Sequence, residues 1–116
     1  MDDCLFCGIV AGEVPADIVR SDDRTVAFRD IAPQAPVHVL IVPRRHITNA
    51  STVTAADAED VTALLLAAQE VAAAEGIGGE DRGYRLVFNV GPDALNSVPH
   101  LHLHLLGGRT LGWPPG

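Results

Sequence analysis

Three of the chain's five histidines, His100, His102 and His104, alternate with leucines in the stretch HLHLHLLGGR. On a β-strand, side chains two residues apart point to the same face and lie about 7 Å apart. The spacing therefore predicts one face of imidazoles and an opposite face of leucines that joins the core. Imidazole can act as a metal ligand, a nucleophile or a proton carrier near neutral pH.

Residues elsewhere in the chain favour catalysis for most of this histidine face over incidental exposure or metal binding alone. Ligands one strand step apart chelate a metal awkwardly and need partners from other segments. A catalytic imidazole needs polar groups that set its tautomer and move protons, and Asn89 and Ser97 precede the histidines. His38 lies inside the β-branched run VHVLIVP, where a lone polar side chain needs a partner. For His38, a core role and a functional role remain equally open.

Composition restricts the classes of function. The formal charge is −7, from 15 acids against 8 bases that are all arginine. An acidic chain is repelled by a polyanion, so we expect no nucleic-acid partner, although a small phosphate ligand stays compatible. The absence of lysine excludes Schiff-base and P-loop chemistry. No apolar run approaches ~18 residues and no signal peptide is evident, so we expect a cytoplasmic protein without a membrane partner.

The cysteines Cys4 and Cys7 form a C-x-x-C pair at the start of the chain. In a cytosolic protein this spacing indicates a metal half-site or a redox pair more than a structural disulfide. A redox pair of the thioredoxin type normally follows a strand, and no strand precedes this one. The position therefore favours metal binding.

The periodicity predicts a single α+β domain spanning 1–116, with 47% hydrophobic residues to build its core. Its most regular element is a helix over 54–75, capped by Thr54, whose apolar stripe is Val61, Leu64, Leu65, Ala68, Val71 and Ala72. Strands are expected in a short segment before Ser21 and at 25–29, 37–43, 83–91 and 100–107. Short connections favour an antiparallel sheet, and two prolines make 31–36 a loop.

These segments together resemble the histidine triad (HIT) superfamily. The matching stretches are HLHLHLL, CLFCGIVAGEVPADIV, AFRDIAPQAPVHVLIVPRRHI, GYRLVFNVGPD and LGGRTLGWPPG, which cover nearly the whole chain. The Trp-Pro-Pro-Gly ending is similar to the histidine triad nucleotide-binding branch. The resemblance implies a HIT-like fold with about five antiparallel strands, one long helix and one short helix.

The resemblance also implies an activity, namely hydrolysis of the P–N bond of purine nucleoside 5′-phosphoramidates of the AMP or GMP type. By this comparison His102 attacks the α-phosphorus and forms a covalent nucleotidyl-histidine, with no metal needed for catalysis. His104 and His38 match the histidines that orient the nucleophile and contact phosphate oxygens. Ser97 matches a serine near the leaving group, and Asn89 an asparagine beside the phosphate.

For the nucleoside, the resemblance assigns Asp30 to the ribose hydroxyls. The apolar positions that match the purine sandwich are Leu5, Phe6, Ile9, Phe28 and Ile31, which periodicity alone would place in an ordinary core. The resemblance further implies a homodimer with a continuous sheet. Some bacterial relatives bind zinc through C-x-x-C and two histidines, which implies a structural zinc ion on Cys4, Cys7, His46 and His100.

One segment departs from the family pattern. Where relatives carry a glycine-rich D-G-G-Q-S or D-A-G-Q-S, this chain has Asp-Ala-Leu-Asn-Ser, with Leu95 at a glycine position beside the phosphate. If that position requires a positive φ, leucine is strained there. Two other functions stay open: a dinucleoside polyphosphate hydrolase or nucleotidyl transferase, and a non-catalytic nucleotide-binding or scaffolding protein.

Overall fold

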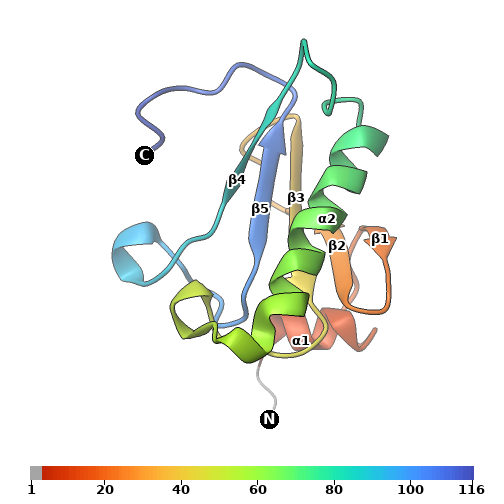
Figure 1. The fold of residues 1–116 in the computed structure, drawn as a ribbon, viewed down its shortest axis with the longest axis vertical. Helices are drawn as coiled ribbons and strands as arrows, with labels where there is room; N and C mark the ends of the chain where they lie inside the picture. Colours follow the sequence, from red (N-terminus) through yellow and green to blue (C-terminus); the bar gives the residue numbers. More distant parts are fainter. Residues whose placement is uncertain (1–3) are drawn as a thin grey trace.

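A computed structural model of the protein describes residues 4–116, so the first three residues of the predicted 1–116 domain lie outside the described part. Five antiparallel strands form one sheet in the order β1-β2-β3-β5-β4 (Figure 1). The strands are β1 Ile18–Ser21, β2 Thr25–Arg29, β3 Val37–Pro43, β4 Tyr84–Val87 and β5 Leu103–Gly107; the helices are α1 Leu5–Val10 and α2 Ala58–Ala74. The predicted α+β class, with one long and one short helix, is confirmed.

Helix α2 covers one face of the sheet and buries the larger part of the core. The leucines between the triad histidines, Leu101, Leu103 and Leu105, are at most 2% exposed and pack in the same cluster as the α2 side chains. The predicted opposite face of leucines is therefore confirmed. In the predicted helical stripe, Leu64, Ala68, Val71 and Ala72 are buried and Val61 is half-buried, but Leu65 is 41% exposed and Ala67 is buried instead.

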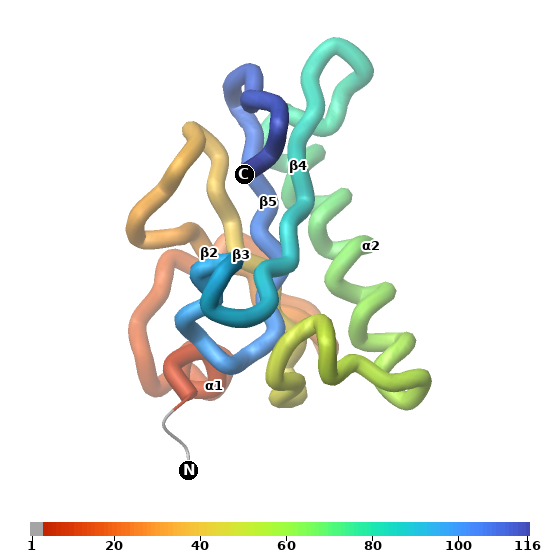
Figure 2. Tube along the Cα trace, turned by 90° about the vertical axis from the view of Figure 1, so that its left-hand side faces the viewer, coloured from red at the N-terminus to blue at the C-terminus, as the bar shows by residue number. Residues whose placement is uncertain are grey.

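Helix α1 lies on the other side of the sheet from α2 (Figure 2). Its Phe6 and Ile9 are buried in a second, smaller cluster, which also contains Val26, Phe28, Leu40 and Val42. Edge-to-face packing of Phe6 on Phe28, with ring centroids 5.4 Å apart, fixes α1 against β2. The short helix is thus held at the face that carries the histidines.

Two strands are shorter than their sequence patterns predict. The expected strand over 100–107 begins only at Leu103, and the expected strand over 83–91 is limited to Tyr84–Val87. The pairing of β3 with β5 stops at Ile41 and Leu103, and beyond it the carbonyl oxygen of Pro43 bonds the His100 imidazole. The carbonyl oxygen of Pro43 thus accepts a hydrogen bond from a side chain and not from the backbone of the neighbouring strand, and the pairing of β3 with β5 ends before it.

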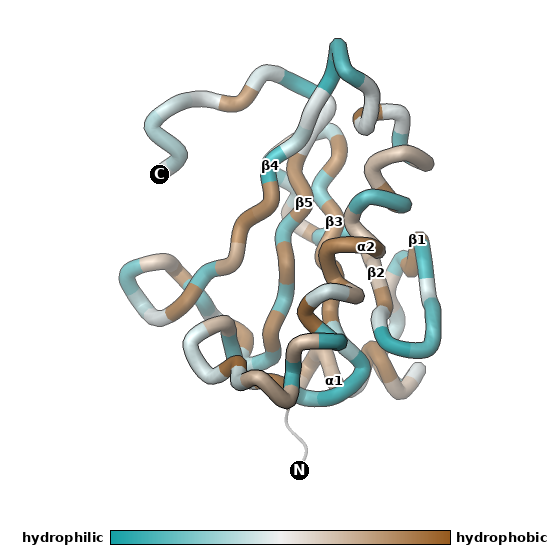
Figure 3. Tube along the Cα trace, in the orientation of Figure 1, coloured by the Kyte–Doolittle hydropathy of each residue, from teal (hydrophilic) through white to brown (hydrophobic). Residues whose placement is uncertain are grey.

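The distribution of hydropathy follows this architecture. Figure 3 shows hydrophobic residues concentrated in the central strands and a hydrophilic turn between α2 and β4. Within residues 4–116, no helix combines the length and the apolar character that crossing a membrane requires.

Candidate functional site

A pocket of about 430 Å³ lies on the sheet face that α1 covers. Most of the predicted nucleotide and catalytic residues line it: Leu5, Phe6, Ile9, Phe28, Asp30, Ile31, Asn89, Leu95, Ser97, His102 and His104. His38 is not among the lining residues: its side chain is buried and contacts the ring of His104, which does line the pocket. A slightly larger hollow of about 470 Å³, between the start of β4 and the C-terminal tail, contains no histidine or cysteine.

The tautomer of His102 follows from its one backbone contact. Its ring Nδ1 lies 2.7 Å from the carbonyl oxygen of His100. Because a carbonyl oxygen only accepts, Nδ1 carries the proton and donates it. In a neutral ring the lone pair then resides on Nε2, the atom that is free to attack an electrophile.

A second chain of hydrogen bonds fixes His38 and His104. The backbone N–H of Gln34 donates to Nδ1 of His38 at 3.0 Å, so the proton of the neutral ring is on Nε2. That Nε2 lies 2.9 Å from Nδ1 of His104 and donates to it. His104 therefore carries its own proton on Nε2, which leaves an N–H donor for a ligand in the pocket.

Burial keeps both of these imidazoles neutral at physiological pH. It lowers the pKa of His104 to about 4, with further lowering from His102 and His38, while Asp30 opposes the shift. Burial also lowers the pKa of His38, again opposed by the Asp30 carboxylate. Because His104 is neutral, it can donate a hydrogen bond without repelling a positive charge on the ring of His102.

Asp30 follows the end of β2 and has two contacts of its own. One carboxylate oxygen accepts the backbone N–H of Ala32 at 2.8 Å, and the other lies 3.4 Å from Nε2 of His38. The side chain also lines the pocket, so its remaining lone pairs can accept hydrogen bonds from hydroxyl groups.

The apolar part of the pocket is built by α1 and β2. The ring of Phe6 contacts that of His102 edge to face, with centroids 5.0 Å apart. Phe6, Ile9 and Phe28 are buried, whereas Leu5 is 49% exposed and Ile31 fully exposed at the rim. The set can therefore enclose a flat apolar group between buried rings and exposed aliphatic side chains.

The segment between β4 and β5 supplies the remaining pocket residues. Asn89 is half-buried and Ser97 is exposed. Leu95 has φ 61° and ψ 31° and is the one non-glycine residue of the described chain with positive φ. Position 95 does require a positive φ, so leucine occupies a left-handed conformation that glycine adopts more readily.

The four predicted metal ligands come together at the edge of the same face. The sulfurs of Cys4 and Cys7 and one ring nitrogen each of His46 and His100 lie within 4.8 Å of one another. Sulfur–nitrogen distances run from 3.2 to 3.4 Å, close to the ~3.5 Å edge of a tetrahedron with ordinary zinc–ligand bonds. Nε2–H of His100 donates to the carbonyl oxygen of Pro43, which directs the Nδ1 lone pair to the cysteines.

The donor set fits a divalent zinc ion chemically. Burial, and then the neighbouring Cys4, raise the pKa of the Cys7 thiol to about 11. Burial also lowers the pKa of His100. Neutral imidazoles are ready ligands, and a bound cation would offset the cost of ionising two adjacent thiols.

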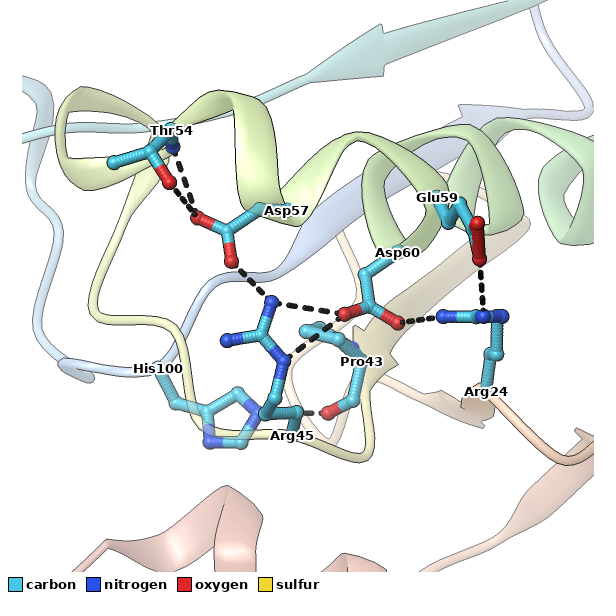
Figure 4. Close-up of polar contacts among 8 residues, drawn as sticks. All are labelled: Arg24, Pro43, Arg45, Thr54, Asp57, Glu59, Asp60 and His100. Carbon is cyan, nitrogen blue, oxygen red and sulfur yellow. Dashed lines mark hydrogen bonds and ion pairs between the residues drawn. The ribbon is translucent and has the colours of Figure 1, made fainter.

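An ion-pair network holds the segment that carries His46. The guanidinium of Arg45 donates to the carboxylates of Asp57 and Asp60, and Arg24 donates to Asp60 from the other side at 2.9 Å (Figure 4). The carboxylate of Asp57 also accepts the backbone N–H of Thr54 at 2.9 Å, before the start of α2. These contacts tie the residue next to His46 to the long helix.

Sequence reasoning did not find these supporting groups. The carbonyl oxygens of His100 and Pro43 and the backbone N–H of Gln34 set the histidine tautomers, and backbone groups leave no mark in residue types. The residue Arg45 did carry a signal, since it stands beside His46 and the next helix begins with acidic residues.

Comparison with known proteins agrees with this geometry. The HIT domain family matches residues 11–111. An uncharacterized HIT-like protein of Synechococcus elongatus is 50% identical over 99% of this chain and 98% of its own. The structure of a HIT family hydrolase from Legionella pneumophila is similar with a TM-score of 0.94 and 51% identity, over 98% of this chain and all of that one.

A more distant similarity extends to the nucleotide-binding branch. The histidine triad nucleotide-binding protein of Candida albicans has a TM-score of 0.82 and 28% identity, over 97% of this chain and 83% of that one. The extent of the domain match and the identity to full-length relatives leave one assignment: this chain is a member of the HIT family.

Proposed function

We propose that the protein hydrolyses the P–N bond of purine nucleoside 5′-phosphoramidates through a covalent intermediate on His102. The observation that carries this proposal is the tautomer of His102, whose Nδ1–H is bonded to the carbonyl oxygen of His100. The free Nε2 belongs to a ring that lines the pocket together with His104 and Ser97. The similarity to a HIT family hydrolase and to a nucleotide-binding protein supports the substrate class.

In the first step, Nε2 of His102 forms a bond to the α-phosphorus and the P–N bond breaks. The departing amine nitrogen takes a proton from solvent, which the hydroxyl of Ser97 relays. The His102 ring becomes positively charged, and its Nδ1–H bond to the carbonyl oxygen of His100 grows stronger as it does. Nε2–H of His104 donates to a phosphoryl oxygen, and Asn89 adds a second donor.

In the second step, water attacks the phosphorus of the nucleotidyl-histidine. A P–O bond forms, the bond from phosphorus to Nε2 breaks, and the proton of the water is released to solvent. The products are the nucleoside monophosphate and free His102 in its starting tautomer. Both steps use the same donors, so one arrangement of side chains serves formation and breakdown of the intermediate.

The nucleoside is assigned to the part of the pocket formed by α1 and β2. A purine fits between the buried rings of Phe6 and Phe28 and the exposed side chains of Leu5 and Ile31. The carboxylate of Asp30 accepts the ribose hydroxyls. The adenine or guanine ring is thereby desolvated while the phosphate stays at the histidines.

We further propose that Cys4, Cys7, His46 and His100 hold a structural zinc ion. When bound, such an ion would fix the N-terminus to the chain that enters β5, without taking part in the reaction. The chain's own contribution is the preformed donor set, in which the carbonyl oxygen of Pro43 orients the ring of His100 and the network around Arg45 holds the segment that carries His46.

A homodimer is the proposed assembly. Strand β4 lies at an edge of the sheet, where its backbone groups can pair with a second copy. Tyr84 and Leu86 on this strand are each 36% exposed, and Leu66 of α2 is 54% exposed. Light scattering would test this, since a monomer at micromolar concentration contradicts the proposal.

The test of the activity uses adenosine and guanosine 5′-phosphoramidates, with His102→Ala as the blank. Wild-type protein should release the nucleoside monophosphate. Mass spectrometry under non-acidic conditions, applied to a rapidly quenched reaction, should find one nucleotide bound to His102. Turnover without a covalent intermediate would contradict the mechanism. Binding without turnover would identify a nucleotide-binding protein, and preferred cleavage of dinucleoside polyphosphates would place the chain in another branch.

A further inference from the structure

Leu95 combines features that packing within the chain does not explain. Its backbone is left-handed, with φ 61°, and its side chain is 86% exposed. In this conformation an L side chain is strained because Cβ approaches the following carbonyl oxygen. Leu95 belongs to neither core cluster. Its side chain therefore adds strain and exposed apolar surface without any gain in burial, and such outliers point to a functional contact.

The place of Leu95 in the pocket limits what it can contact. It shares the pocket with Asn89, Ser97 and Val98, which all belong to the chain between β4 and β5. The other apolar lining residues come from α1 and the segment next to it, from β2 with its end, and from β3. The pocket therefore has two apolar walls, of which the 89–98 wall also carries the hydroxyl of Ser97.

The substrate has two parts, the nucleoside and the leaving amine, and each must lie against one of these walls. The wall of α1 and β2 offers stacked rings and the Asp30 carboxylate, which suit a base and a ribose. In a displacement at phosphorus, the attacking and leaving atoms lie roughly in line. With the nucleoside placed on its wall and Nε2 of His102 attacking, the 89–98 wall remains for the leaving amine.

We propose, on the basis of the proposed function, that Leu95 is a specificity-determining residue for phosphoramidates whose amine carries an apolar substituent. The substituent covers the exposed leucine and removes both surfaces from water. It stays bonded to nitrogen when the P–N bond breaks, and leaves with the protonated amine. A phosphoramidate that releases ammonia has no group that reaches Leu95.

The test compares adenosine 5′-phosphoramidate with its N-benzyl derivative. Ammonia and benzylamine have similar basicity, so the two P–N bonds have similar intrinsic reactivity. Wild-type protein should show a kcat/KM about tenfold higher for the N-benzyl compound, the effect expected from burying a small apolar area. Leu95→Ala keeps the left-handed strain and removes the side chain, and should bring the ratio near one. Leu95→Met should preserve the preference.

A binding measurement supplies an independent readout. In the His102→Ala background, the N-benzyl compound should bind about tenfold more tightly than the unsubstituted one, and adding Leu95→Ala should abolish the difference. A ratio of kcat/KM that is unchanged in Leu95→Ala overturns this inference and leaves the proposed function standing. If Leu95→Ala becomes monomeric while its kcat/KM ratio stays unchanged, the inference is also overturned and Leu95 is an interface residue. Wild-type protein that hydrolyses neither compound overturns the proposed function and this inference together.

Discussion

The backbone carbonyl oxygen of His100 lies 2.7 Å from Nδ1 of His102 and accepts a hydrogen bond from its N–H. The side chain of His100 faces away from this bond, with its Nδ1 3.3 Å from Sγ of Cys4 and 3.4 Å from Sγ of Cys7. One residue therefore belongs to both the proposed zinc site and the proposed catalytic arrangement. Any shift of His100 changes the position of the proposed nucleophile.

Removing one of the proposed zinc ligands should destabilise the protein. Cys7→Ser should lose zinc and lower the Tm by about 10 °C, because losing part of a structural metal site costs on the order of 2 kcal/mol in a domain of this size. Elemental analysis and thermal melts check both effects. Wild-type protein stripped by a chelator should match the variant, and the chelator should not lower the variant's Tm further. Equal metal content in both proteins contradicts the site.

The fold was largely predictable from the sequence because its signals are local. Alternation over HLHLHLL placed Leu101, Leu103 and Leu105 in the core, and the helical stripe placed α2 on them. The strand ends were not predictable. Where β5 begins depends on Pro43, whose carbonyl oxygen bonds a distant side chain and not the neighbouring strand.

The hydrogen bond from Gln34 to His38 can be tested through the backbone alone. Gln34→Ala keeps the N–H that donates to Nδ1 of His38, so kcat should stay unchanged. Gln34→Pro removes that N–H, which frees the tautomer of His38 and weakens its bond to His104. Loss of an oriented proton donor should lower kcat about tenfold with little change in KM.

The nitrogen-15 chemical shifts of the His38 ring give a readout that is independent of activity. In wild-type protein and Gln34→Ala they should show the tautomer protonated on Nε2, and in Gln34→Pro a mixture. The same tautomer in all three proteins would mean that Gln34 does not set it.

The candidate site was predictable in its residue types but not in its connections. The alternating pattern grouped His102 with His104, the family resemblance added His38, and the structure brings the three rings together. The bonds that give each ring a separate task come from the backbone of Gln34 and His100. Almost every residue carries a backbone N–H and a carbonyl oxygen, so only the folded chain shows which of them meet an imidazole.

Burial of His104 should make stability depend on pH below neutrality. Its pKa is about 4 in the folded protein, against about 6.5 in an unfolded chain. Between these pH values the unfolded state binds more protons than the folded state. The contribution of neutral His104 to the stability of the folded protein is therefore complete above pH 6.5 and is lost as the pH falls toward 4. The slope from one such group is at most about 1.4 kcal/mol per pH unit.

Thermal melts of wild-type protein and His104→Gln between pH 4 and 7, both with chelator, measure this contribution. The variant should lose less stability than the wild type as the pH falls. Parallel curves for the two proteins would show that His104 is not the group that titrates.

The left-handed backbone at Leu95 gives a prediction about stability alone. Leu95→Gly should stabilise the protein by about 1 kcal/mol, because the strain removed outweighs the added backbone freedom of glycine in the unfolded state. The side chain is 86% exposed, so little packing is lost. The Tm should rise by about 5 °C. Leu95→Ala is the matched control: it removes the same methyl groups and keeps the strain, so its Tm should stay near that of the wild type. An equal rise in both variants would trace the gain to the loss of exposed apolar surface and not to the backbone.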